Sequence, residues 1–295
     1  MGFEVKKMDF IGKRKFWYIL SLLVLIPGLI SLMLQGLNLG IDFAGGTIAQ
    51  VKFQQEVRIE DLRAELTNQG YGSSKIQEMD DGSYQIKTTY LEQEQQNQLV
   101  EGLQTSLGEL ELLRSEAVGA TIGKELVQSG LLALGIAILL MIAYIAYRFE
   151  LKFAIAGIIA LFHDILIVVS VFSIFQLEVD STFIAAVLTI FGYSINDKIV
   201  IFDRIRENLH KVKKAELLGV VNTSIKQSLT RSINTSVSTL ILLVALFLFG
   251  GQTTKIFVLS LIIGIAVGAY SSIFFASPLW YDMTMRGKDK QLSRR

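Results

Sequence analysis

Five ionisable residues lie inside or beside long apolar stretches and are the candidates for chemistry. They are His163, Asp164, Asp197, Lys198 and Arg231. The first two interrupt a run of apolar residues, and Asp197 and Lys198 come near the end of another. The apolar run that follows Arg231 is too short on its own for a membrane-spanning helix, which needs about 20 residues. That helix is therefore expected to extend back through Arg231.

A charged group at membrane depth costs several kcal/mol or more, so such residues are expected to face a helix bundle and find partners. The short side chain of Asp197 cannot reach the headgroups, so it is expected either to pair with Arg231 or to bind a proton. Lys198 is long enough to extend to the inner headgroups, and we predict that it does. His163 and Asp164, with Asn196, either take part in proton movement or only contact neighbouring helices.

The elements that must position these residues are membrane-spanning helices. Just over half of the 295 residues are apolar, and they gather into long runs rather than at helical or strand spacing. A polytopic α-helical membrane protein is therefore predicted. Its six spans are expected at 16–35, 129–147, 153–175, 182–202, 230–249 and 256–281.

Basic residues set the expected orientation. They gather before the first span, between the second and third, after the fourth and at the C-terminus, whereas the turn 176–180 has acidic residues and no basic one. The positive-inside rule then places both termini in the cytoplasm. The corresponding regions are a cytoplasmic N-terminus (1–15), a cytoplasmic loop (203–229) within the five-helix bundle 129–281, and a cytoplasmic tail (282–295).

A small folded domain is expected between the first two spans, at 36–128, outside the membrane. Within it, residues 38–127 include 15 acidic and 7 basic residues. Alternating residues predict strands, helical spacing predicts two helices, and Asp80–Ser83 is typical of a hairpin turn. The order β-α-β-β-α-β is that of a ferredoxin-like α+β fold.

Several classes of site are unlikely on composition. The chain has no cysteine and two histidines, which disfavours a metal site. The stretch Gly119–Glu125 is one residue short of a phosphate-binding loop and lacks its Ser/Thr, so no nucleotide or other cofactor is expected. Basic loops are ordinary in membrane proteins, so no nucleic-acid partner is expected. No catalytic residues are predicted.

Gly264 and Gly268 form a small-xxx-small pattern in the sixth span. Such a pattern lets two helix backbones approach closely. The close contact is expected either with a partner subunit or within this chain, and the sequence leaves both open.

Several blocks in order resemble the SecD/SecF family of protein-export membrane proteins, on its SecF side. The resemblance runs over nearly the whole chain, and the block at the end of the fourth span is the most specific. The blocks are Leu39-Gly-Ile-Asp-Phe-Ala-Gly-Gly-Thr47, Tyr147-Arg-Phe149, Phe162-His-Asp164, Asn196-Asp-Lys-Ile-Val-Ile-Phe-Asp-Arg-Ile-Arg-Glu-Asn208 and Arg231-Ser-Ile-Asn-Thr-Ser236.

The resemblance implies a non-enzymatic subunit that pairs with SecD, beside the SecYEG channel, and uses the proton-motive force to help a preprotein finish its export. It is related to the resistance-nodulation-division exporters. The family's proton pathway matches Asp197 and Arg231 here. Two other functions remain open: a stand-alone small-molecule proton antiporter, and a purely structural subunit of the translocon.

Overall fold

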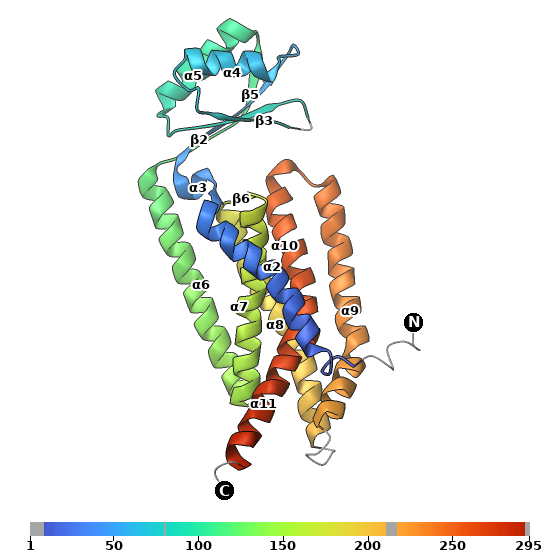
Figure 1. The fold of residues 1–295 in the computed structure, drawn as a ribbon. Helices are drawn as coiled ribbons and strands as arrows, with labels where there is room; N and C mark the ends of the chain where they lie inside the picture. Colours follow the sequence, from blue (N-terminus) through green and yellow to red (C-terminus); the bar gives the residue numbers. More distant parts are fainter. Residues whose placement is uncertain (1–8, 80, 211–216, 293–295) are drawn as a thin grey trace. The chain divides into compact units, whose positions relative to one another are not determined.

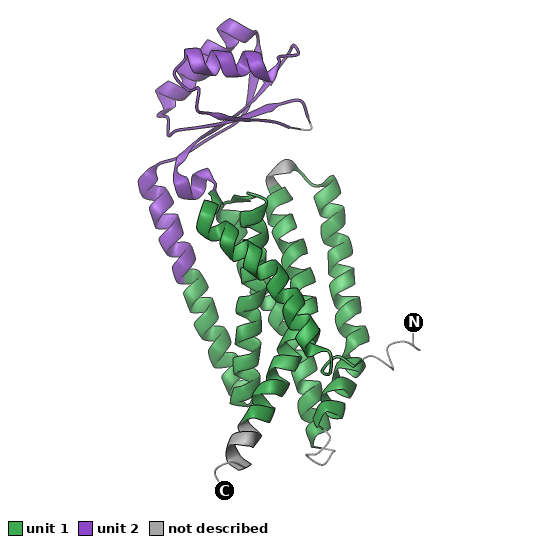
Figure 2. Cartoon of the chain, in the orientation of Figure 1, with its two compact units in different colours: residues 1–38, 133–295 green, residues 39–132 purple. Residues whose placement is uncertain are grey.

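The computed structural model describes residues 9–79, 81–210 and 217–292. The chain divides into two compact units, residues 1–38 with 133–295 and residues 39–132 (Figure 2). The first unit is a bundle of long helices and the second holds the four-stranded sheet (Figure 1). Each unit is described by itself below.

Within the described residues, six helical stretches are long and apolar enough to cross a membrane, which confirms the predicted number. The first five are single helices. The sixth consists of α10, a π-helical turn η2 and α11 in succession. Their bounds are α2 (Arg14–Gln35), α6 (Ala120–Arg148), α7 (Leu151–Ile174), α8 (Ser181–Leu209), α9 (Leu217–Phe249), α10 (Gln252–Ser271), η2 (Ser272–Ala276) and α11 (Ser277–Leu292).

The centre of the bundle is made by α7, α8 and the sixth span. About half of the residues in each of these spans are buried, whereas α2, α6 and α9 are largely exposed along their apolar lengths. Aromatic rings fill the interior at one end of the bundle: Phe153 of α7 stacks on Trp280 with centroids 4.5 Å apart and also meets Phe202 of α8. The exposed apolar faces are suited to lipid or to a partner's helices.

The stretch 203–229, expected as a cytoplasmic loop, is helical over most of its described length. Helix α8 continues to Leu209 and α9 begins at Leu217, so only a short connection between them is not helical or lies outside the described residues. One face of this extension of α9 is buried, with Val220, Val221 and Ile225 beside Asn222 and Ser224, whereas Thr223 and Gln227 on the other face are exposed. A hydropathy run therefore ends well before the helix does.

The predicted start of the second span at 129 is also late. Helix α6 begins at Ala120, so most of the stretch compared above with a phosphate-binding loop is helical. The helix begins directly after the last strand of the sheet domain, with only Gly119 between them. The N-terminal turns of α6 contain polar residues, which a hydropathy window does not count as span.

The sheet domain follows the predicted order β-α-β-β-α-β. Its four strands are antiparallel neighbours in the order β3-β4-β2-β5. The elements are β2 (Gly46–Phe53), α4 (Ile59–Asn68), β3 (Lys75–Glu78), β4 (Tyr84–Thr88), α5 (Gln93–Leu107) and β5 (Leu110–Val118). Short pieces precede the domain or join the long helices: β1 (Asn38–Leu39), α3 (Ile41–Ala44) and β6 (Glu178–Val179).

Both helices of this domain cover one face of the sheet (Figure 1). Leu62 and Leu66 of α4 and Leu99 and Leu103 of α5 are almost fully buried in one core with Ile86 of β4. These leucines recur at four-residue spacing, which puts each pair on one side of its helix. The domain thus has a core of its own.

Two adjacent glycines start the sheet. Gly45 and Gly46 have φ of +76° and +146°, a region that side chains disfavour. A Cβ on Gly46 would lie 2.7 Å from the carbonyl oxygen of Thr88 on β4, closer than real contacts allow. Glycine at this position lets β2 begin directly beside β4.

Candidate functional site

Helix α8 carries two polar pairs that face different helices. Tyr193 and Asp197, four residues apart, bond to α9: the Tyr193 hydroxyl donates to the Thr235 carbonyl at 3.0 Å, and Asp197 Oδ2 accepts from Ser236 Oγ at 3.3 Å. Ser194 and Lys198, also four apart, turn instead toward α7 and the sixth span. Residues i and i+4 share a helix face, so each pair points to one side of α8.

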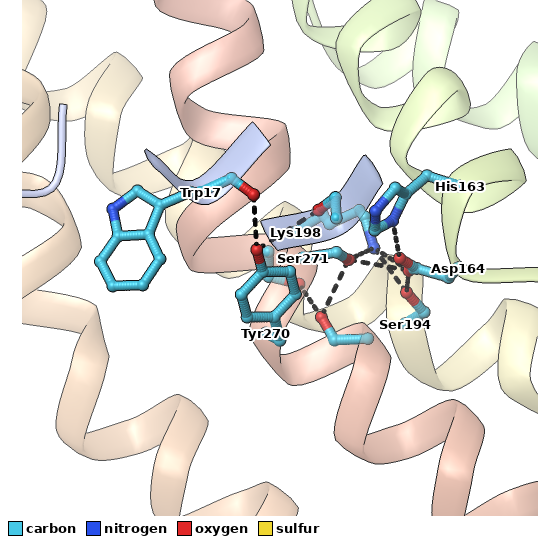
Figure 3. Close-up of polar contacts among 10 residues, drawn as sticks. Trp17, His163, Asp164, Ser194, Lys198, Tyr270 and Ser271 are labelled. Atoms are coloured by element: carbon cyan, nitrogen blue, oxygen red, sulfur yellow. Dashed lines mark hydrogen bonds and ion pairs between the residues drawn. The ribbon is translucent and has the colours of Figure 1, made fainter. Parts of the chain in front are cut away.

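The second pair belongs to a buried ionic cluster (Figure 3). Lys198 Nζ donates to Asp164 Oδ2 at 2.7 Å, to Ser194 Oγ at 2.5 Å and to Ser271 Oγ at 3.0 Å. All three donors of the ammonium group are therefore used. Asp164 and Lys198 are both 0% exposed.

Asp164 receives four hydrogen bonds in all. Ser194 and Ser271 donate to Oδ2 at 2.5 and 2.8 Å, alongside Lys198, and His163 Nδ1 contacts Oδ1 at 3.0 Å. A buried ion pair is stable only when its remaining polar atoms are bonded, and this one meets that condition. The cluster ties α7, α8 and the end of α10 together.

A proline accounts for the way the sixth span reaches the cluster. Pro278 has no N–H and its ring would clash with the carbonyl four residues earlier, so regular α-helix is disfavoured at this point. The chain forms the π-helical turn η2 directly before it, and Ser277 Oγ donates to the Ser272 carbonyl at 2.9 Å. Ser271, the last residue of α10, lies at the start of this irregular turn.

The prediction that Lys198 extends to the headgroups is wrong. A length argument gives the depth of a residue but not the helix face it occupies, and the face of Lys198 points into the bundle. Asp164 lies opposite and supplies the counter-charge. Ser194 and Ser271 also belong to the site and were missed; only the four-residue spacing of Ser194 and Lys198 could have indicated one of them.

Asp197 is buried, as expected of an acid that cannot reach the headgroups. Its predicted ion pair with Arg231 is not formed: within the described part of the chain, no hydrogen bond or salt bridge joins the two. Arg231 lies on the exposed face of α9 instead, five residues before Ser236. Asn196 is exposed on α8 and is not brought to either polar pair.

Gly264 and Gly268 both face α8 of this chain. A Cβ on Gly264 would overlap the Ile190 side chain, and one on Gly268 would lie 3.0 Å from Ser194 Oγ. Of the two contacts left open by the sequence, the structure has the one within the chain. Gly268 thereby lets α10 approach α8 beside the ionic cluster.

The site is made of buried ionisable side chains and their hydroxyl partners. Over the described residues, no group of three or more histidine, cysteine or acidic side chains could hold a metal ion. What the helices bring together is a fully bonded lysine–aspartate pair and, on the other side of α8, a buried acid with one hydroxyl partner. Buried ionisable groups of this kind mark ion or proton pathways in membrane proteins.

Comparison with known proteins identifies the family of the chain. The family model for the C-terminal region of protein export membrane proteins SecD/SecF matches residues 98–286, and the SecD/SecF GG motif matches residues 30–57. The chain belongs to the SecD/SecF family. The GG motif contains Gly45 and Gly46, whose backbone angles are described above.

Curated members of the SecD/SecF family are similar over most of their length. Protein translocase subunit SecF of Sebaldella termitidis is 41% identical, with 91% of this chain and 89% of the relative covered. SecF of Acidaminococcus fermentans is 42% identical (94% and 97% covered), and that of Haemophilus influenzae is 37% identical (94% and 86%). The chain is thus a multi-pass protein-transport protein of this family.

A solved structure shows the same fold. The crystal structure of SecDF, a translocon-associated membrane protein from Thermus thermophilus, superposes with a TM-score of 0.87 at 34% identity. The match covers 96% of this chain but 40% of the SecDF chain. A second SecDF structure, in a super-membrane-facing form, gives a TM-score of 0.71 at 34% identity, with 98% of this chain and 40% of that chain covered.

Proposed function

We propose that the chain is the SecF-type half of a proton-driven export device, in which Asp197 carries the proton and Arg231 controls its charge. The observation that carries the proposal is the buried carboxylate of Asp197, which has Ser236 as its hydrogen-bond partner. The same helix, α9, presents Arg231. A carboxylate in an apolar bundle is ionised when a cation approaches and binds a proton when the cation withdraws.

The partner is a SecD-type six-span half. Helix α9 exposes a polar face within its length, made of Arg231, Asn234, Thr235 and Ser238. Their spacing puts them on one side of the helix, and polar side chains in hydrocarbon are costly. A polar helix of a second half would cover this face, and the SecDF chain has the length for such a half because this chain matches 40% of it.

The sheet domain is the part that would meet a translocating preprotein. Its charge supports a place outside the cytoplasmic membrane, since the basic residues of the chain gather at the other ends of the spans. Its strand order β3-β4-β2-β5 with two helices on one face supports a ferredoxin-like fold. Such a domain, beside the SecYEG channel, would act on the preprotein late in export.

The test is preprotein export into membrane vesicles that contain the partner half, with and without a proton gradient. Asp197→Asn keeps the size and the hydrogen bond to Ser236 but cannot carry a proton, so the gradient-dependent part of export should be lost. Asp197→Glu, the matched control, keeps a carboxyl and should retain part of it. Full gradient-dependent export by Asp197→Asn would leave a purely structural role for the chain.

A further inference from the structure

His163 has a vacant, buried nitrogen. Its Nδ1 contacts Asp164 Oδ1 at 3.0 Å, and an ionised carboxylate can only accept, so Nδ1 carries the hydrogen. Nε2 then has a lone pair with no partner within the described residues. The side chain is only 3% exposed, so this atom is buried. Unpaired buried polar atoms are uncommon and call for an explanation.

The groups around the ring suit a positively charged imidazole. Asp164 accepts from Nδ1, and the ring stacks on Phe275 of η2 with centroids 4.1 Å apart and an angle of 17° between planes. A cation over an aromatic face is attracted by the ring's quadrupole. From α2, Tyr18 contacts Phe275 at 5.6 Å, edge to face.

The positive charge of Lys198 would repel a second positive charge on His163. Its ammonium lies on Asp164 Oδ2, whereas His163 contacts Oδ1, so the two cations share one carboxylate through different oxygens. With His163 neutral the cluster has no net charge; with a proton on Nε2 its net charge is +1. Ser194 and Ser271, the other members, are neutral.

We propose that His163 Nε2 is a second proton-binding site of this bundle, with its tautomer set by Asp164. A hydronium ion from the solvent transfers its proton to the Nε2 lone pair: the N–H bond forms as an O–H bond of the hydronium breaks, water is released, and Nδ1–H stays on Asp164. The site lies on the α7 side of α8, whereas Asp197 lies on the α9 side. This deepens the proposed proton pathway and rests on it for what the bound proton does, though not for its binding.

The chain offers a direct measurement, because it has only two histidines. His210→Gln, at an exposed position, leaves His163 as the single histidine. In the full chain with ¹⁵N-labelled histidine in lipid bilayers, nitrogen NMR should show Nδ1 protonated and Nε2 bare at about pH 8. On titration toward about pH 5, where histidine changes charge, Nε2 should gain a proton.

Two results would overturn the inference: an Nε2 that stays bare over the whole range, or a neutral ring that carries its hydrogen on Nε2. The titration needs neither gradient nor export, so its outcome is separate from that of Asp197→Asn.

Discussion

Asp197 and Lys198 are adjacent in the sequence but bind different helices: Asp197 Oδ2 accepts from Ser236 of α9, and Lys198 Nζ donates to Asp164 of α7. Lys198 is held by three bonds and Asp197 by one. The lysine therefore fixes the rotation of α8, and the aspartate is presented toward the helix that carries Arg231. The two adjacent residues thus bring α8 into contact with two different helices.

Removing only one partner of the Lys198–Asp164 ion pair should destabilise the fold more than removing both. Lys198→Met leaves Asp164 buried without its cation, and removing one partner of a buried pair destabilises by about 3–5 kcal/mol. The double variant Lys198→Met with Asp164→Leu removes both charges and should recover most of the lost thermal stability. Thermal unfolding in detergent measures both; a double variant as unstable as the single one would mean that the pair is not what the bundle depends on.

Gly268 and Gly264 should be intolerant of larger side chains for an internal reason. Gly264→Leu would push against Ile190, and overpacking of this kind costs about 1–3 kcal/mol. Gly135→Leu is the matched control, since a Cβ there would meet nothing within 4 Å. We expect the first to lower the unfolding temperature and the second to leave it nearly unchanged. Equal stability with loss of partner binding in Gly264→Leu would instead favour a contact with a partner subunit.

Asn222 should hold the start of the chain against α9. Its Oδ1 accepts from the backbone N–H groups of Phe10 and Ile11 at 2.9 and 3.1 Å, and its Nδ2 donates to Asp9 at 2.7 Å. Asn222→Ala leaves two buried donors unbonded and should cost about 1–3 kcal/mol. Asp9→Ala, which removes only the exposed partner, should cost less. Equal losses in thermal unfolding would contradict this ranking.

Asp9 also makes the contact between Asn222 and residues 9–11 depend on pH. The Gly12 N–H and the Asn222 amide hold the pKa of this carboxyl below its ordinary value. A lowered pKa means that the contribution is complete above the carboxyl's ordinary pKa and is lost as the pH falls through the folded-state value. The difference in unfolding temperature between the parent chain and Asp9→Ala should therefore shrink on acidification. A difference that grows would reverse the sign of this linkage.

Orientation can be tested without background, because the chain has no cysteine. Gln55→Cys lies on an exposed residue of the sheet domain, and His210→Cys on an exposed residue after α8. An impermeant thiol reagent added to intact cells should label the first and not the second. Labelling of His210→Cys in sealed cells would invert the orientation inferred from the basic residues.

The sequence predicts elements well where a single physical constraint decides them. The number of spans follows from hydrocarbon thickness, and the order of strands and helices between 46 and 118 from residue periodicity. It predicts side-chain contacts poorly where they depend on which face of a helix the residue occupies. Lys198 and Asp197 have the same depth, but 100° of rotation separates a fully bonded lysine from an aspartate with one partner.

The contribution of Ser271 could not be read from the sequence at all. Ser271 contacts Asp164, which is 107 residues away in the chain, beside the π-helical turn that precedes Pro278. The missing ion pair of Arg231 is a different case. Its exposed position on α9 agrees with the proposed function, in which a partner's helix covers this face and supplies the counter-charge.

The most direct test of the account is proton flux through the assembled pair. Proteoliposomes that hold this chain with its SecD-type partner would be given a pH gradient, and internal pH followed with a dye during preprotein movement. We predict that Asp197→Asn abolishes the flux, that Asp197→Glu keeps part of it, and that both variants assemble with the partner as the parent chain does. Undiminished flux through a correctly assembled Asp197→Asn variant would contradict the central claim that Asp197 carries the proton.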